Sequence, residues 1–226
     1  MRRAREKVQC DVTRNDVQLA RGANPHYRQL TRPLDRSMSN AIKIRVGDED
    51  VWTLRDILPN EPGLRMLFVA KTPAPVSVEE GHYFQGSQGR AFWNRLREFG
   101  LLNPMTEFED DSLLAHGYGL TDIVKVPRSY GNEPSDAEYR SGMNRILELI
   151  TQHKPRVVTF VYKGVLDNVL RLHFGIRSKA EYGFNPSHER SFGTRVFAFP
   201  LPGVGNCNRA QAVAAMSELR RFLESQ

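Results

Sequence analysis

Residues 64–101 carry the strongest fold signal in the chain and read LRMLFVAKTPAPVSVEEGHYFQGSQGRAFWNRLREFGL. They begin with an apolar run from Met66 to Ala70, which is typical of a buried parallel strand. The polar, proline-rich loop from Lys71 to Pro75 ends this strand, because proline has no backbone N–H to give to a strand or a helix. The sequence therefore predicts a buried strand followed by a stiff polar loop.

Aromatic residues and a helix follow this loop. Tyr83 and Phe84 lie in a Gly-rich segment, and an amphipathic helix is expected from about Arg90 to Phe99. Ligands of open α/β sheets bind just beyond the carboxyl ends of the strands. A stiff polar loop at that place, next to aromatic side chains, predicts a pocket for a flat polar ring.

Further strands and helices alternate along the rest of the chain. We expect strands at residues 117–124, 157–161 and 194–199. Helices are expected at residues 135–150, 164–172 and 210–223, and Ser135 with Glu138 forms a capping box at the start of the first. This alternation predicts an α/β fold, a three-layer α/β/α sandwich around a central four-stranded parallel sheet.

The start of the chain is strongly basic. The formal net charge is +6, and residues 1–40 hold nine basic and four acidic residues, so most of the excess lies there. We expect residues 1–50 to form a basic, weakly structured arm and residues 51–226 a single α/β domain, with a short helix from Trp52 to Leu58. A basic arm suits a polyanion such as nucleic acid. Alternatively, the arm has no such role and the protein begins at Met38.

The composition excludes several classes of protein. Cys10 and Cys207 are the only cysteines and lie far apart, too few for a disulfide framework or a four-cysteine iron–sulfur cluster. No HExxH motif or paired Cys/His spacing indicates zinc. No apolar run approaches the roughly 18 residues of a membrane span. We expect a soluble, cytoplasmic monomer that needs neither a metal nor another cofactor.

Three loops are expected to meet at the carboxyl edge of the sheet. They are Lys71 to Pro75, Thr121 to Lys125 and Pro200 to Arg209. The last loop places Gly203 and Gly205 before a helix, whose free N–H groups suit a phosphate. Such turns are also common without any ligand, so a purely structural role is the alternative.

Several short motifs occur in a characteristic order along the chain. They are KTPA at 71–74, a Gly-x-x-Phe ending at Phe84, FWNRL at 92–96, GLTDIV at 119–124, HKPRVV at 153–158 and PLPG at 200–203. This order resembles the uracil-DNA glycosylase superfamily, and within it the branch of mismatch-specific uracil- and thymine-DNA glycosylases. The resemblance covers about residues 63–224. It implies an α/β/α sandwich and a DNA repair enzyme that removes uracil from DNA, leaving an abasic site.

The resemblance also implies roles for residues around the first loop. The family motif Gly-x-Asn-Pro-Gly falls on AKTPA, so Ala70 and Pro73 would contact the substrate and Thr72 would place the attacking water. Thr72 departs from the family, because a hydroxyl can orient water but is a poor base. Lys71, together with backbone N–H groups around it, would stabilise the uracil anion. Lys71 could equally be a solvated loop lysine.

The remaining implied roles lie on the aromatic segment, the second strand and the last loop. Phe84 would stack on the flipped base, or could belong to the core. Asp122 would accept the N3 proton of uracil or act as a general base, or could form a structural salt bridge with Lys125 or an arginine. Ser87 would contact substrate or shape a turn. DNA would be clamped by Pro202, Gly203, Gly205, Asn206 and Arg209. Gly203 replaces the serine of the family.

Two other functions remain open from the sequence. The replaced motif residues are compatible with a non-catalytic protein of the same fold that binds uracil or abasic sites in DNA. The glycine-rich loop at residues 203–206 is compatible with a flavodoxin-like enzyme of nucleotide or phosphate metabolism.

Overall fold

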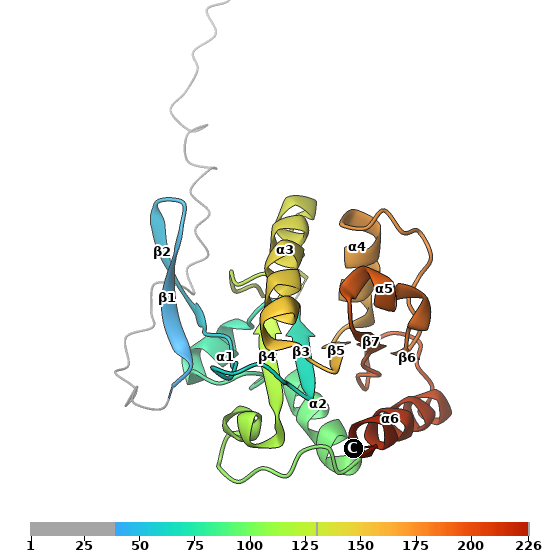
Figure 1. Cartoon of the computed structure of the whole chain (residues 1–226). Helices are drawn as coiled ribbons and strands as arrows, with labels where there is room; N and C mark the ends of the chain where they lie inside the picture. The colour runs from blue at the N-terminus through green and yellow to red at the C-terminus, as the bar shows by residue number, and fades with distance from the viewer. Residues whose placement is uncertain (1–38, 130, 226) are drawn as a thin grey trace, which may run out of the picture. The chain divides into compact units, whose positions relative to one another are not determined.

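The computed structural model of the chain describes residues 39–129 and 131–225. Residues 1–38, which make up most of the expected basic arm, lie outside the described residues. The central sheet has the strand order β4-β3-β5-β7-β6 (Figure 1). Its parallel strands are β3 (Met66–Ala70), β4 (Tyr118–Asp122), β5 (Val157–Phe160) and β7 (Arg195–Ala198). The predicted four-stranded parallel sheet is therefore confirmed, with the two-residue antiparallel strand β6 (Gly183–Phe184) added at one edge.

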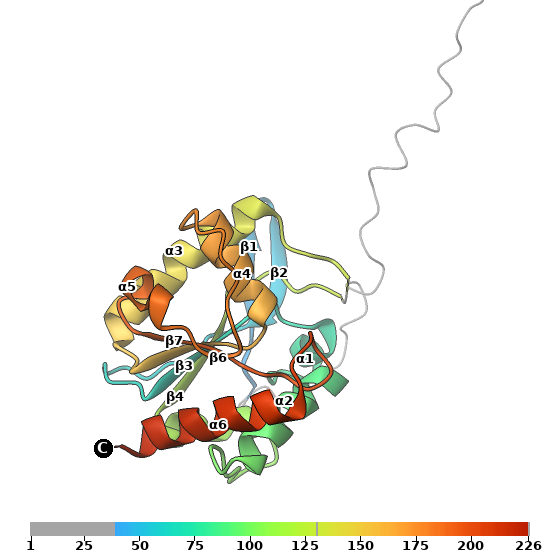
Figure 2. The ribbon, with the colours of Figure 1, turned by 90° about the vertical axis from the view of Figure 1, so that its right-hand side faces the viewer.

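Helices cover both faces of the sheet, as the alternating pattern predicted. Figure 2 shows α2 and α6 on one face and α3, α4 and α5 on the other. The α-helices are α1 (Pro75–Glu80), α2 (Ser87–Glu98), α3 (Asp136–His153), α4 (Lys163–Leu172), α5 (Glu189–Phe192) and α6 (Arg209–Glu224). Short 3-10 helices are η2 (Glu109–Ser112), η3 (Leu114–His116) and η4 (Pro186–His188).

The side chains of β3 show why two helical layers are needed. Met66, Phe68 and Ala70 belong to the apolar cluster that contains α2 and α6. Leu67 and Val69 point to the opposite face and belong to the cluster that contains α3 and α4. All five side chains are buried, because successive residues of a strand alternate between the faces of a sheet.

An antiparallel hairpin precedes the central sheet. Strands β1 (Ala41–Val46) and β2 (Glu49–Leu54) pair in register, and Gly47 takes a φ of +60° in the turn between them. The expected helix from Trp52 to Leu58 is therefore wrong, and the weakly structured stretch does not extend to residue 50. The alternation of apolar and charged residues in AIKIRV, a strand pattern, was the missed signal.

The carboxyl ends of the parallel strands bring the expected loops together. Ala70 pairs with Asp122 in the register of β3 and β4. Beyond this pair, the N–H of Ile123 donates to the carbonyl of Ala70 at 2.9 Å, and the N–H of Val124 donates to that of Lys71 at 3.1 Å. These bonds fix the first loop against the segment that follows β4.

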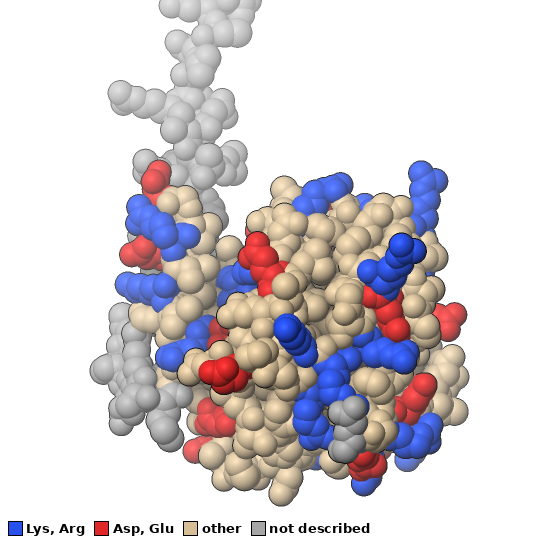
Figure 3. All heavy atoms as spheres, in the orientation of Figure 1, with Lys and Arg blue, Asp and Glu red and all other residues tan. Residues whose placement is uncertain are grey.

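Basic side chains gather around the C-terminal end of α6 (Figure 3). Arg65 and Arg156 donate to the carbonyls of Leu223 and Phe222, each at 2.9 Å. Cations are favourable at the negative end of a helix. Arg65 precedes β3 and Arg156 precedes β5, so this basic patch lies at the amino ends of the strands, away from the converging loops. None of the helices in residues 39–129 and 131–225 is long and apolar enough to cross a membrane.

Candidate active site

A cavity of about 260 Å³ lies at the carboxyl edge of the sheet. Its walls come from the loop after β3, the segment before α2, the end of β4 and the residue after β5. The lining residues that matter for chemistry are Thr72, Pro73, Phe84, Ser87, Asp122 and Tyr162. Four segments that are distant in sequence therefore meet at one small cavity, as expected for a ligand site of an open α/β sheet.

Asp122 is the buried carboxylate of this cavity. Its side chain is 1% exposed, and its Oδ2 lies 3.3 Å from Nζ of Lys125. The other oxygen, Oδ1, is buried and has no hydrogen-bond partner of good geometry among the described residues, although the nearby Tyr83 hydroxyl acts to lower the pKa of Asp122. Burial raises the pKa of Asp122, the charge of Lys125 opposes this, and the charge of Asp56 adds to it. Buried polar atoms are nearly always paired, so the unpaired Oδ1 distinguishes Asp122 from an ordinary buried carboxylate.

Lys125 connects Asp122 to two further groups. Its Nζ lies 2.8 Å from Oδ1 of Asp56 and 3.0 Å from the hydroxyl of Tyr83. Lys125 is therefore held between two carboxylates, and the ion pair between Asp122 and Lys125, which the sequence left open, is present.

Asp56 and Arg145 complete the charge balance behind the cavity. Nη1 of Arg145 lies 2.6 Å from Oδ2 of Asp56, and the hydroxyl of Thr121 donates to Oδ1 of Asp56 at 2.7 Å. Burial alone would raise the pKa of Asp56, but Lys125 and Arg145 outweigh it and the pKa is lowered. Asp56 is therefore a carboxylate at neutral pH. Neither residue could be identified from the sequence, because Asp56 and Arg145 are 89 positions apart and only the folded chain brings them together.

Phe84 lies in the cavity wall and also packs against aromatic side chains of the core. It lines the cavity, and its ring centroid lies 4.6 Å from that of Phe92 and 5.6 Å from that of Trp93. Its φ of +60° is rare for a residue other than glycine. Gly89 makes this geometry possible, since a Cβ there would lie 2.0 Å from the carbonyl oxygen of Phe84.

Asp110 holds the segment that carries the aromatic side chains. Its Oδ2 accepts from the N–H of Tyr83 at 2.8 Å, and its Oδ1 lies 2.9 Å from Nδ1 of His82. Burial opposes the charged form of His82, but the hydrogen bond to Asp110 and the nearby carboxylates outweigh it and raise the pKa of His82. Among the described residues, His82, Asp110 and Asp111 also form the one group spaced closely enough for a metal. The hydrogen bond that Asp110 accepts from the Tyr83 backbone, together with the contact between Asp110 and His82, indicates a structural role.

The residues of the first loop divide between two cavities. Thr72 lines the cavity of about 260 Å³ and also a neighbouring cavity of about 340 Å³. Lys71 lines only the neighbouring cavity, and its Nζ lies 2.6 Å from Oε1 of Glu133. Ala70 is 1% exposed and lines neither cavity. The structure thus brings together Thr72, Pro73, Phe84, Ser87 and Asp122, but not the Lys71 ammonium group or Ala70.

The glycine-rich loop before α6 forms part of the neighbouring cavity. Gly203 and Gly205 line it, with φ values of +73° and +71°. A Cβ at Gly205 would lie 2.1 Å from the hydroxyl of Tyr182, which donates to the carbonyl of Val204 at 3.1 Å. Both glycines are therefore required by the backbone path. Asn206 is exposed and lines neither of these two cavities.

Tyr162 is a site residue that was not predicted. It lines both cavities, and burial together with the charge of Asp122 raises its pKa to about 12. Its hydroxyl therefore stays protonated at neutral pH and can donate a hydrogen bond. A signal was present, because Tyr162 directly follows a predicted strand, at the same edge as Thr72 and Asp122.

Comparison with known proteins agrees with this arrangement. Residues 59–220 match the family described as the uracil DNA glycosylase superfamily. The chain belongs to this superfamily. It is also similar to a G/U mismatch-specific uracil DNA glycosylase of Schizosaccharomyces pombe (strain 972 / ATCC 24843), with 27% identity over 148 residues, which cover 64% of the chain and 44% of that protein. The chain thus spans less than half the length of this relative.

Membership of the uracil-DNA glycosylase superfamily confirms the resemblance inferred from the motifs. The family fold is the α/β sandwich described above, with a mostly parallel central sheet. The chain therefore belongs to a family of DNA glycosylases.

Proposed function

We propose that this chain hydrolyses the N-glycosidic bond of uracil that has flipped out of DNA, leaving an abasic site. The observation that supports this most directly is Oδ1 of Asp122, a buried carboxylate oxygen without a partner in a residue that lines the cavity. A base inside a duplex cannot be reached by an enzyme, so the nucleotide must leave the stack and enter such a cavity.

Asp122 reads the polar edge of the base in this proposal. A carboxylate can only accept hydrogen bonds, and uracil offers the N–H at N3 as a donor. Cytosine presents a lone pair at the same position, which the carboxylate repels. Phe84, also in the cavity wall, offers an apolar face on which either ring could stack. The carboxylate therefore supplies the discrimination and the aromatic ring supplies general affinity.

Bond cleavage places opposite charges on the two products of the glycosidic bond. As the bond from the sugar C1′ to the base nitrogen breaks, the base takes the electron pair and the sugar becomes cationic. The hydroxyl of Thr72 can orient the water that adds to C1′, and the water proton leaves to the base or solvent. The hydroxyl of Tyr162, protonated at neutral pH, can donate to an oxygen of the departing base.

The neighbouring cavity would hold the sugar and its phosphates. It shares Thr72 and Tyr162 with the base cavity and adds Lys71, Arg128 and the loop at Gly203. Two basic side chains beside a glycine-rich backbone are suited to a phosphate chain. Since Lys71 lies here, we assign it to DNA binding rather than to stabilisation of the uracil anion.

The test is cleavage of a labelled duplex with one uracil opposite guanine, beside the same strand without its partner. Excess protein is added, and alkali then breaks the strand at each abasic site. We expect breakage at the uracil with the wild-type chain and with Asp48→Ala, whose side chain is fully exposed in the hairpin turn, but not with Asp122→Ala.

One observation favours a second function. Thr72 and Gly203 replace the asparagine and serine of the family motifs, which is compatible with a protein that binds damaged DNA without cutting it. Tight retention of uracil or abasic DNA without strand breakage would support this binder and contradict the glycosylase. Neither breakage nor retention would contradict both.

A further inference from the structure

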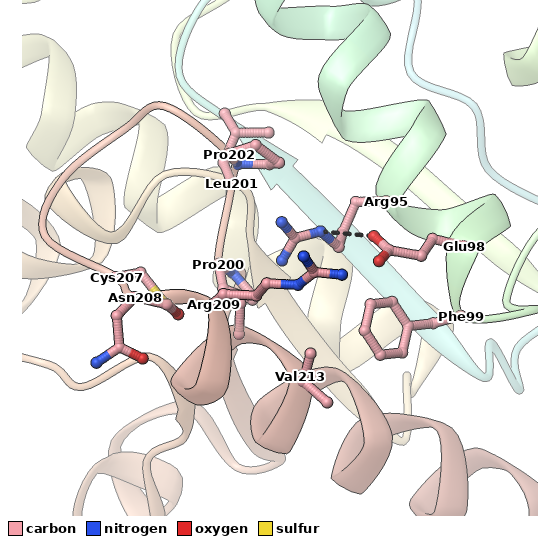
Figure 4. Close-up of a pocket in the computed structure, with 11 residues that line it drawn as sticks. Arg95, Glu98, Phe99, Pro200, Leu201, Pro202, Cys207, Asn208, Arg209 and Val213 are labelled. Atoms are coloured by element: carbon pink, nitrogen blue, oxygen red, sulfur yellow. Dashed lines mark hydrogen bonds and ion pairs between the residues drawn. The ribbon is translucent and has the colours of Figure 1, made fainter.

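A third cavity, of about 400 Å³, lies between the end of α2 and the start of α6 (Figure 4). It contacts the loop before α6 through Pro200, Pro202 and Cys207, whereas the neighbouring cavity described above contacts Gly203 to Gly205. This third cavity shares no lining residue with either of the other two. It is therefore a separate hollow beside the same loop.

Two arginine side chains point into this cavity (Figure 4). Arg95 comes from α2, its side chain is only 14% exposed, and its Nε lies 3.4 Å from Oε2 of Glu98. Within the described residues, its two Nη atoms have no hydrogen-bond partner. Arg209 is the first residue of α6 and has no ion pair or side-chain hydrogen bond to any described residue. Most of the guanidinium donors at the cavity are therefore unused.

The charges of the cavity do not balance. Two guanidinium groups face one carboxylate, that of Glu98, and the positive end of the 16-residue helix α6 adds to the excess. A largely buried arginine without a full set of acceptors is costly. A bound phosphate group would balance the positive charge and supply the missing acceptors. Its oxygens match the planar fork of a guanidinium and form charge-assisted hydrogen bonds with it.

We propose that this cavity binds a phosphate group through the guanidinium groups of Arg95 and Arg209. The source we favour is a backbone phosphate of DNA on the far side of the loop from the flipped nucleotide, and this source rests on the proposed function. The other source with the same chemistry is free phosphate or a small phosphorylated compound. Arg209 was expected to contact DNA, whereas Arg95 lies in a helix to which the sequence assigned no ligand.

The first experiment measures binding to undamaged duplex DNA over a range of salt concentrations. The logarithm of the association constant falls linearly with the logarithm of the salt concentration, and each phosphate contact that is lost makes this slope less steep by about 0.9. Since both arginines bind the same phosphate, we expect Arg95→Gln and Arg209→Gln each to lower the magnitude of the slope by up to about 0.9, and the double variant to lower it by no more than that. Arg220→Gln is the matched control, because it removes the same charge from the far end of α6, where Arg220 pairs with Glu224. Arg220→Gln should change the salt slope less than either cavity variant does.

Glu98→Gln should strengthen DNA binding, whereas the two arginine substitutions should weaken it. Removing the carboxylate that competes for Arg95 should strengthen binding several-fold, which a merely structural ion pair would not do. If Arg95→Gln fails to fold, Arg209→Gln still tests the proposal, because the Arg209 side chain makes no polar contact with the described residues.

The second experiment titrates inorganic phosphate into the wild-type chain and into Arg209→Gln by calorimetry. A lowered salt slope supports the DNA source. Phosphate binding that Arg209→Gln abolishes, with an unchanged salt slope, supports the small-molecule source. Equal behaviour of the wild type, both cavity variants and Arg220→Gln in both experiments would overturn the proposal. Neither experiment requires uracil excision, so its outcome is separate from that of the proposed function.

Discussion

The ammonium group of Lys125 binds one oxygen of Asp122 and leaves the other unpaired in the cavity wall. This relationship sets both the orientation and the charge of the carboxylate. Oδ2 is directed toward Lys125, so Oδ1 is the atom that would meet the base in the proposed function. Because burial raises the pKa of Asp122 while Lys125 lowers it, the same contact also controls when Oδ1 is charged.

Asp122→Asn should weaken uracil excision and stabilise the fold. The amide would direct its oxygen toward Lys125 and its NH2 toward the base, where it meets the N3–H as a second donor. Loss of a hydrogen bond to a charged group costs about 1.5–3 kcal/mol, so single-turnover excision should fall about 10- to 100-fold. The free energy of unfolding at neutral pH should rise, because a carboxylate with a raised folded-state pKa favours unfolding when it is ionised.

Asp48→Asn is the control for this change, since it removes the same charge at an exposed position. It should leave excision and stability close to wild type. Full excision by Asp122→Asn would contradict the assignment of Asp122 as the reader of the base edge.

Lys125→Met should move the acid limb of the excision profile to higher pH. The carboxylate form of Asp122 accepts the N3–H, so excision declines as pH falls through the pKa of Asp122, which lies above its ordinary value of 3.8. Removing Lys125 takes away the cation that lowers this pKa. Single-turnover rates across the acid range check the shift, with Lys179→Met, an exposed loop lysine, as the control. An unmoved acid limb in Lys125→Met would show that Asp122 does not determine the profile.

The sheet and much of its ligand edge were predictable, because they depend on local patterns. Uninterrupted apolar runs identify buried parallel strands, and the residues that follow them reach the same edge. The same reasoning placed the segments that contain Thr72 and Asp122 at this edge. It could have placed Tyr162 there as well, because Tyr162 directly follows a predicted strand. The hairpin before residue 55 was missed because its strands intersperse apolar and polar residues and contain no long uninterrupted apolar run.

The supporting residues could not be predicted in the same way. Asp110 contacts Tyr83 across 27 positions, and Asp56 contacts Arg145 across 89. Such pairs have no sequence pattern, since they arise only when separate elements pack. The position of the Lys71 ammonium group likewise depends on Glu133, in a loop 62 residues away.

Gly89→Ala should displace Phe84 and impair the cavity. The new methyl group would meet the carbonyl oxygen of Phe84 at 2.0 Å, so the backbone must move. Overpacking of this kind costs about 1–3 kcal/mol, which thermal unfolding would measure. Excision should fall together with stability.

Gly164→Ala is the matched control for this substitution. A Cβ at Gly164, in the first turn of α4, has no neighbour within 4 Å. The change should be neutral or stabilise by up to about 1 kcal/mol, because alanine favours helix more than glycine does. If the two variants were equally stable, the close approach between Gly89 and Phe84 would not be a constraint.

His82 should make the stability of the protein depend on pH. Its pKa in the folded state is raised above 6.5, so folding favours the protonated ring. This contribution is fully present below pH 6.5 and is lost as pH rises through the folded-state pKa. Urea unfolding at a series of pH values should show this decline in the wild type and in His173→Gln, but not in His82→Gln. A decline of the same size in His82→Gln would assign it to other groups.

Thr72→Asn should accelerate excision if Thr72 occupies the water-placing position of the family. A hydroxyl offers one donor and an acceptor on a single atom, whereas an amide offers a carbonyl acceptor and two N–H donors on separate atoms, so it can hold the water and the sugar or base at once. Thr72→Val keeps the shape but removes the hydroxyl, so excision should fall by about 2- to 10-fold, in line with the roughly 0.5–1.5 kcal/mol of a neutral hydrogen bond. Thr151→Val, at an exposed position on α3, serves as the control. Opposite shifts in Thr72→Asn and Thr72→Val are required, because a purely structural threonine would be impaired by both changes.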